Sequence, residues 1–345
     1  MVKKALPGTT DQQEIEPSGA PPRTRSFWAT LGRIFLRQRE ASVIIVAIVL
    51  IIYFQLSNDN FLTLQNIPVL SQYTAATAII AAGEVMLLIC GEIDLSVGEV
   101  YAFAPYIMYF AYQAGIPLVA SIILALLVSA VVGLINGAIT VWLKVPSLIT
   151  TLGTLFLIEG ITLIISGATQ VPTPEEPVIK TIMGNSAYSE ILWAIFIVIV
   201  MQIVLSWTRW GIHTIAIGSN PDGASEVGIN INKVKIGNFI LTALFAGLSG
   251  ILDSFYVTTI NPPAAISDIM LTAIAGAVIG GTVLQGGSGT IVGAFLGTLV
   301  LSILNNGFTL LGANAYVYDA ILGLAILIAM ILNVRLQLLR KAGQE

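Results

Sequence analysis

Residues 209–235 read RWGIHTIAIGSNPDGASEVGININKVK, the longest polar interruption between two apolar runs in the second half of the chain. Asn220 is a preferred N-cap residue, Pro221 suits the first helical position, and Gly228 suits the exit from a helix. This spacing predicts a helix of roughly two turns, which is too short to be stable by itself in water. We therefore expect the flanking apolar runs, or a partner docked against the helix, to hold it in place.

The composition around this stretch is that of a membrane protein. Hydrophobic residues make up 56% of the 345 residues and charged residues only 10%, whereas about a quarter of a soluble domain is charged. The single cysteine, Cys90, rules out an internal disulfide, and the single histidine, His213, rules out any motif that needs two. The chain also lacks a Gly-Lys-Ser/Thr phosphate loop, a serine triad and a nucleic-acid patch. We expect no catalytic residue, no metal site and no cofactor bound by this chain.

Apolar runs of the length that crosses a bilayer recur along the chain. A spanning helix needs about 20 mostly apolar residues, and the fold class expected is an all-α membrane protein with about ten such helices. The first, third and eighth candidates are short or carry polar residues, so they are candidates for broken or re-entrant segments. The ten runs are 42–56, 67–90, 98–113, 117–143, 147–167, 189–207, 234–256, 267–283, 289–311 and 314–334.

The placement of Lys and Arg tests this count. With the N-terminus inside and ten crossings, only Lys180 of the 15 basic residues lies outside, in agreement with the positive-inside rule. We therefore expect both termini and the 209–235 loop to be cytoplasmic. The domains predicted are a leader with a juxtamembrane amphipathic segment, 1–41, a transmembrane body, 42–334, and a tail, 335–345.

Two short patterns recur at an offset of 170 residues, and they suggest an internal repeat. Leu134–Gly137 matches Leu304–Gly307, and Leu152–Gly153 matches Leu322–Gly323. A separation of five spans reverses the direction of the chain, so the copies would form the inverted-repeat halves common in transporters. Glycines spaced by four predict close helix packing in lipid: Gly133/Gly137, Gly276/Gly280 and Gly289/Gly293/Gly297.

Two carboxylates lie inside apolar runs, Glu84 in the second and Glu159 in the fifth. A carboxylate at mid-span costs roughly 2.5–3.5 kcal/mol on insertion scales, so both side chains should face the protein interior or a wet cavity. They either contact a hydroxylated cargo or form buried hydrogen bonds that fix helix register. With the three asparagines of the repeat, Asn136, Asn305 and Asn306, they make up the substrate-pathway residues expected from the sequence. In the loop before residue 98, Asp94 is expected to cap the third span.

Four segments together resemble a known family, the permease subunits of bacterial ABC importers for monosaccharides, typified by the ribose system. They are Gly91–Gly98 (GEIDLSVG), Val145–Gly153 (VPSLITTLG), Ala216–Lys235, and Gly280–Gly312 (GGTVLQGGSGTIVGAFLGTLVLSILNNGFTLLG). Two positions depart from the family pattern. Glu92 stands where a second glycine is usual, and Ser288 stands where a basic residue often follows the second double glycine.

The resemblance implies a homodimer in the bacterial inner membrane, bound to a cytoplasmic ABC ATPase that holds the ATP and Mg. A periplasmic sugar-binding protein would deliver a monosaccharide or polyol, which crosses by alternating access, and no nucleic acid is involved. Residues 216–232 would be the coupling helix that sits in a groove of the ATPase. The coupling residues are then Gly218, Ser219, Asn220, Pro221, Asp222, Ala224, Ser225, Glu226, Gly228 and Ile229. The alternative is a proton-coupled sugar symporter that uses Glu84 or Glu159.

Overall fold

The computed structural model describes residues 39–184, 188–262 and 267–314, with scattered helical positions between 317 and 331. The expected leader, up to residue 38, and the tail 335–345 lie outside the described residues, as does most of the tenth candidate span. The helices have the bounds α2 Arg39–Ser57, α3 Asn66–Ile89, α4 Val97–Gln113, α5 Leu118–Trp142, α6 Ser147–Ser166, α7 Pro177–Met183, α8 Ser189–Trp207, α9 Arg209–Ser219, α10 Pro221–Glu226, α11 Ile231–Val257, α12 Ser267–Ile279 and α13 Ile291–Leu310.

Helices match nine of the ten candidate spans, and the all-α fold class is confirmed. Within the described residues, seven helices are long and apolar enough to cross a membrane, namely α2, α3, α5, α6, α8, α11 and α13. The count of ten crossings and the orientation of the termini stay predictions. The first candidate is one continuous helix, α2. The third is also continuous, because the backbone of α4 stays helical through Pro105. The eighth, α12, is short, with 13 residues.

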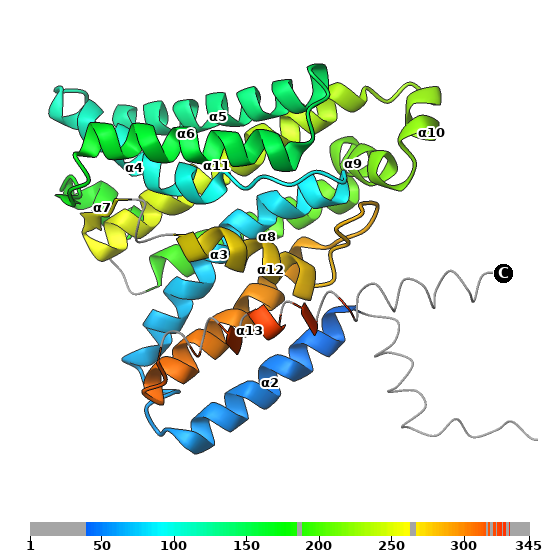
Figure 1. Ribbon diagram of the computed structural model, residues 1–345. Helices are drawn as coiled ribbons and strands as arrows, with labels where there is room; N and C mark the ends of the chain where they lie inside the picture. The colour runs from blue at the N-terminus through cyan, green and yellow to red at the C-terminus, as the bar shows by residue number, and fades with distance from the viewer. Residues whose placement is uncertain are drawn as a thin grey trace, which may run out of the picture. The chain divides into compact units, whose positions relative to one another are not determined.

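The core is organised around α3, which α8, α11, α12 and α13 contact along its length (Figure 1). From Thr74 to Ile89 every residue of α3 is buried. A helix that is apolar on all sides belongs in such an interior position. The outer helices α2, α5, α6 and α8 instead expose leucine, isoleucine and valine side chains, as helices that face lipid do.

Glycine pairs bring helices into backbone contact, as their spacing predicts. A Cβ placed on Gly133 of α5 would lie 2.5 Å from the carbonyl oxygen of Phe239 in α11. A Cβ on Gly297 of α13 would lie 2.0 Å from the carbonyl oxygen of Gly276 in α12. Any larger residue would separate these helices, so the prediction of close packing is confirmed.

One end of the bundle carries the only strands among the described residues. β1 (Val171–Pro172) pairs antiparallel with β2 (Thr259–Ile260). The pairing joins the loop after α6 to the loop after α11, and α7 follows β1 in the same loop. The described part of the loop between α6 and α8 therefore contains regular structure.

Candidate functional site

The short helix predicted from residues 209–235 is present as α10. The Asn220 side-chain oxygen accepts a hydrogen bond from the backbone N–H of Gly223 at 3.1 Å. Pro221 is the first helical residue, and Gly228 leaves the helix with a φ of 83°, a conformation that glycine adopts without strain. The sequence did not indicate that a second helix, α9, precedes this one. It starts at Thr208, whose hydroxyl caps the N–H of Gly211.

The inner face of α9 and α10 is buried against the ends of α3 and α11. Ala224 is 4% exposed and packs with Ile217, Cys90 and Val234. The rest of α10 is exposed: Pro221, Asp222, Ser225 and Glu226 all face away from the bundle. The segment thus has one face fixed to the spans and one face free for a partner.

Asn238 of α11 is the buried centre of this contact. Its side-chain nitrogen donates to the carbonyl oxygen of Met86 at 3.2 Å, to the Cys90 sulfur at 3.3 Å and to the Thr214 hydroxyl at 3.3 Å. Its side-chain oxygen accepts from the Trp210 indole N–H at 2.8 Å. One amide therefore joins α9 to both α3 and α11. Burial raises the pKa of the Cys90 thiol, which lies just past the end of α3, to about 11.

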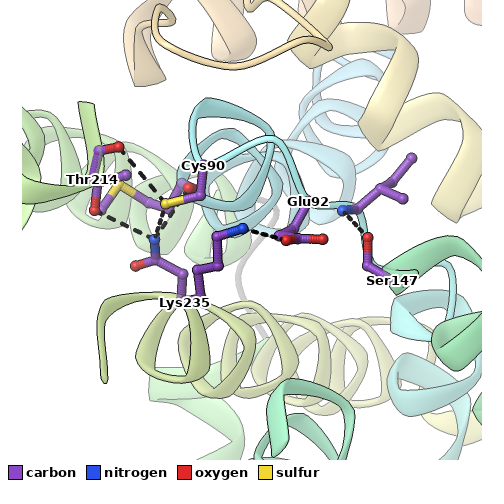
Figure 2. Close-up of polar contacts among 8 residues, drawn as sticks. Cys90, Glu92, Ser147, Thr214 and Lys235 are labelled. Atoms are coloured by element: carbon purple, nitrogen blue, oxygen red, sulfur yellow. Dashed lines mark hydrogen bonds and ion pairs between the residues drawn. The ribbon is translucent and has the colours of Figure 1, made fainter. Parts of the chain in front are cut away.

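Glu92, one of the two departures from the family pattern, forms an ion pair with Lys235 at the start of α11 (Figure 2). Both side chains are mostly buried, with 14% and 19% exposed. The pair ties the loop after α3 to the end of the 209–235 segment. Next to it, the Ile93 N–H donates to the Ser147 hydroxyl at 3.3 Å, so α6 holds the same loop.

Asp94 does not cap α4 in the way the sequence suggested. Its carboxylate accepts from the backbone N–H of Ser96 at 2.8 Å and from the Ser96 hydroxyl at 2.6 Å, which forms a turn ahead of the helix. Asn136 of α5 donates to Asp94 Oδ2 at 3.3 Å, and its oxygen accepts from the Thr154 hydroxyl at 2.6 Å. Burial raises the pKa of Asp94, and the hydrogen bonds from Ser96 and Asn136 oppose that rise.

The loop 280–289 closes the same end of the bundle. The N–H of Gly287 donates to the carbonyl oxygen of Ile89 at 2.8 Å. Gly218 sits directly over that oxygen, since a Cβ on Gly218 would lie 1.6 Å from it. All four segments that carried the family resemblance therefore meet around the C-terminal end of α3.

The positions of two lysines near this end agree with the predicted topology. Lys144 and Lys235 line one shallow pocket, so the loop after α5 and the 209–235 segment lie on the same side, as ten crossings require. Lys180 instead pairs with Glu175 in the loop that carries β1.

A cavity of about 370 Å³ lies away from this end. It is lined by α3 residues 72–77 and by parts of α4, α11, α12 and α13. Of the five residues expected in a substrate pathway, Asn305 lines it. The sequence analysis missed Asp253, Gln72 and Tyr101, which also line it. Asp253 is a carboxylate within the apolar run 234–256, so the criterion that selected Glu84 would also have found it.

The other expected pathway residues lie elsewhere. Glu84 is fully buried in α3, and neither of its carboxyl oxygens has a hydrogen-bond partner among the described residues. Asn136 belongs to the Asp94 network described above, and Asn306 exchanges two hydrogen bonds with Asn66, at 2.7 and 2.8 Å. Glu159 is half-buried on α6. None of these four lines the cavity.

This fold and these segments define a multi-pass membrane permease. The family model described as "Branched-chain amino acid transport system / permease component" matches residues 66–330. The chain belongs to this family of ABC importer permeases, and the resemblance inferred from the motifs is confirmed.

The similar proteins include permeases of several import systems. The xylose/arabinose import permease protein XylH of Sulfolobus acidocaldarius is 43% identical, over 86% of this chain and 85% of the relative. The autoinducer 2 import system permease protein LsrC of Photorhabdus luminescens is 31% identical, over 88% of this chain and 92% of the relative. LsrC of Yersinia enterocolitica is also 31% identical, over 87% of this chain and 83% of the relative. No solved structure matches the chain.

Proposed function

We propose that this chain is the membrane-spanning subunit of an ATP-driven importer of a monosaccharide or a related polyol. One observation carries the proposal: α10 has a buried face packed against α9 and the ends of α3 and α11, and an exposed face. Val227 lies at the end of α10, outside any span, and 77% of its apolar side chain is exposed. Such a residue is suited to a docking contact.

The docked partner is a cytoplasmic ABC ATPase, which binds the ATP and Mg. A six-residue helix is not stable alone, and here Ala224 and the Asn220 cap hold it to α9. Movement of the ATPase against α10 therefore reaches α3 through the Asn238 amide and α11 through Lys235, and the bundle alternates access. In this arrangement the ATPase supplies all the residues that bind the nucleotide.

The remaining assignments follow from the family. Two copies of the chain form the pathway in the cytoplasmic (inner) membrane, and a sugar-binding protein outside delivers the cargo. The names of the relatives favour small neutral sugars, xylose and arabinose among them.

The test is reconstitution. The chain in proteoliposomes with its ATPase and binding protein should take up radiolabelled sugar only with ATP, and the chain alone should take up none. Glu226→Pro should abolish co-purification of the ATPase while the protein stays inserted, because proline disrupts the end of α10. Glu226→Ala removes the same carboxylate but keeps the helix, so it should retain more of the ATPase than the proline variant does. Normal ATPase yield with the proline variant would refute the docking assignment.

The buried Glu84 carboxyl favours one other candidate, a proton-coupled symporter, because protonation would remove the charge of a fully buried carboxylate. Uptake by the chain alone under an imposed pH gradient, lost in Glu84→Gln, would support the symporter. Uptake that needs ATP and ignores the gradient would exclude it.

A further inference from the structure

The cavity of about 370 Å³ lies at the end of the bundle that the β1–β2 pair covers. Thr259 and Ile260 of β2 line it. The loop that carries β1 is bonded to its walls, since the Thr173 hydroxyl donates to the carbonyl oxygen of Ser254 at 2.6 Å. Thr77, the lining residue of α3 nearest the other end, is 12 residues from Ile89, or about 18 Å along the helix. The cavity is thus well separated from the coupling segment.

The lining includes several hydrogen-bonding groups and one carboxyl group. Among the described residues that line the cavity, Asp253 carries that carboxyl group, and none is Lys, Arg or His. The other hydrogen-bonding groups include the amides of Gln72 and Asn305 and the hydroxyl of Ser302. Tyr73 and Tyr101 add aromatic surface.

The Asp253 carboxylate is held in a fixed orientation. Gln72 donates from its side-chain nitrogen to Asp253 Oδ1 at 2.7 Å. The Tyr101 side chain lies beside the same carboxyl group. Both neighbours come from other helices, α3 and α4, so the carboxylate is positioned before any ligand arrives. Pre-positioned acceptors of this kind lower the cost of binding.

We propose that this cavity is a binding subsite within each protomer for one neutral monosaccharide or polyol, with Asp253 as the central hydrogen-bond acceptor. The inference rests on the proposed transport function and adds a site and a substrate class to it. Ligand pockets range from about 300 to 1,000 Å³, so this one, near the lower limit, suits a single sugar ring rather than an oligosaccharide. Hydroxyl groups donate to the carboxylate and pair with the amides, and the tyrosines cover the apolar face of the ring.

The charge of the site selects against anions. A sugar phosphate would bring negative charge towards Asp253 with no cation among the lining residues to offset it. The subsite therefore distinguishes free sugars from phosphorylated ones.

The test measures the direct binding of sugars to the permease in the absence of the sugar-binding protein. The permease–ATPase complex in nanodiscs is titrated with D-xylose, L-arabinose, D-ribose and D-ribose 5-phosphate, and saturation-transfer NMR detects the bound ligand. At least one neutral sugar should bind, and ribose 5-phosphate should bind at least about tenfold more weakly than ribose. Asp253→Asn should weaken the sugar signal about tenfold or more, since hydrogen bonds to charged groups are the stronger ones.

A second variant guards against misfolding of Asp253→Asn. Val257→Trp fills the cavity from its rim, where Val257 is 40% exposed, and it removes no hydrogen bond; it should also abolish the signal. Leu192→Trp, on a face of α8 with 63% exposure, is the matched control and should bind sugar normally. Unchanged binding in Val257→Trp, or equal binding of the phosphate, would overturn the inference.

The two proposals fail in different ways. If the wild-type complex shows ATP-driven uptake but no bound sugar in the nanodisc titration, the subsite is refuted and the transport function is supported. If ATP-driven uptake is absent, the proposed transport function is refuted, whatever the nanodisc titration shows.

Discussion

Gly218 gives the sharpest test of how the coupling segment is attached. An added Cβ at this position would lie 1.6 Å from the carbonyl oxygen of Ile89 and 2.5 Å from the backbone nitrogen of Gly287. Non-bonded carbon and oxygen atoms stay roughly 3 Å or more apart. Gly218→Ala must therefore push the end of α9 away from α3 by about 1.4 Å or break the bond between Gly287 and Ile89.

The size of the effect follows from opposing contributions. Overpacking costs about 1–3 kcal/mol, and loss of the Gly287 bond adds about 1 kcal/mol. Alanine within a helix regains about 0.5–1 kcal/mol relative to glycine. We expect a net destabilisation of about 1–3 kcal/mol, concentrated where α9 meets α3, and weaker coupling of ATP hydrolysis to uptake.

The measurements are thermal unfolding of the purified protein, followed by tryptophan fluorescence, and the ratio of ATP hydrolysed to sugar imported in proteoliposomes. Gly153→Ala is the matched control because nothing lies within 4 Å of a Cβ there, so it should be neutral or stabilising. If Gly218→Ala melts at the wild-type temperature and keeps the wild-type ratio, the described contact between α9 and α3 is wrong.

Three further predictions concern the same end of the bundle. Glu92→Gln and Lys235→Gln should each lower the melting temperature, and the double variant should lose less than their sum, because each single change leaves a mostly buried charge unpaired; strictly additive losses would argue against the pair. Asn238→Leu should destabilise by about 1–3 kcal/mol, since it leaves the Trp210 N–H without its acceptor; unchanged melting would contradict the role of this amide. Cys90 should react with maleimide at pH 8 about 100-fold more slowly than an ordinary thiol, because a pKa near 11 rather than 9 lowers the thiolate fraction by that factor, and the rate should rise with pH up to about 11.

Local signals explain what the sequence predicted well. The Asn220 cap, the Pro221 start and the Gly228 exit depend on neighbouring residues alone, and the structure has all three. The spans follow from apolar runs, and the close helix contacts follow from glycines spaced by four. Each of these needs no knowledge of which helix lies beside which.

The missed features depend on long-range contacts. Asp253 meets Gln72, 181 positions away, and Glu92 meets Lys235, 143 positions away. The sequence marked Glu92 as an unusual charge but gave no means of choosing its partner. The strands β1 and β2 are two residues each, too short for alternation to be visible.

The repeated asparagines show how the two halves of the chain relate to the central helix. Asn136 of α5 bonds to Asp94 and Ser96, just past the C-terminal end of α3. Asn306 of α13 bonds to Asn66, at the N-terminal end of α3. Both asparagines lie in the C-terminal parts of their helices, so α5 and α13 approach opposite ends of α3 and run in opposite directions.

That reversal is what an inverted repeat requires, and it gives the two asparagines a common role. Each amide anchors its helix to one end of the same buried helix, through hydrogen bonds rather than through contact with the cavity. Replacing either should therefore loosen one end of α3 and leave sugar binding in the cavity intact. Asn136→Leu should weaken the attachment of the loop at residues 91–98 and with it the coupling of ATP hydrolysis to transport. Asn306→Leu should destabilise the opposite end and leave ATPase association unchanged. Loss of ATPase co-purification in Asn306→Leu, in a protein that still folds, would refute this division of roles.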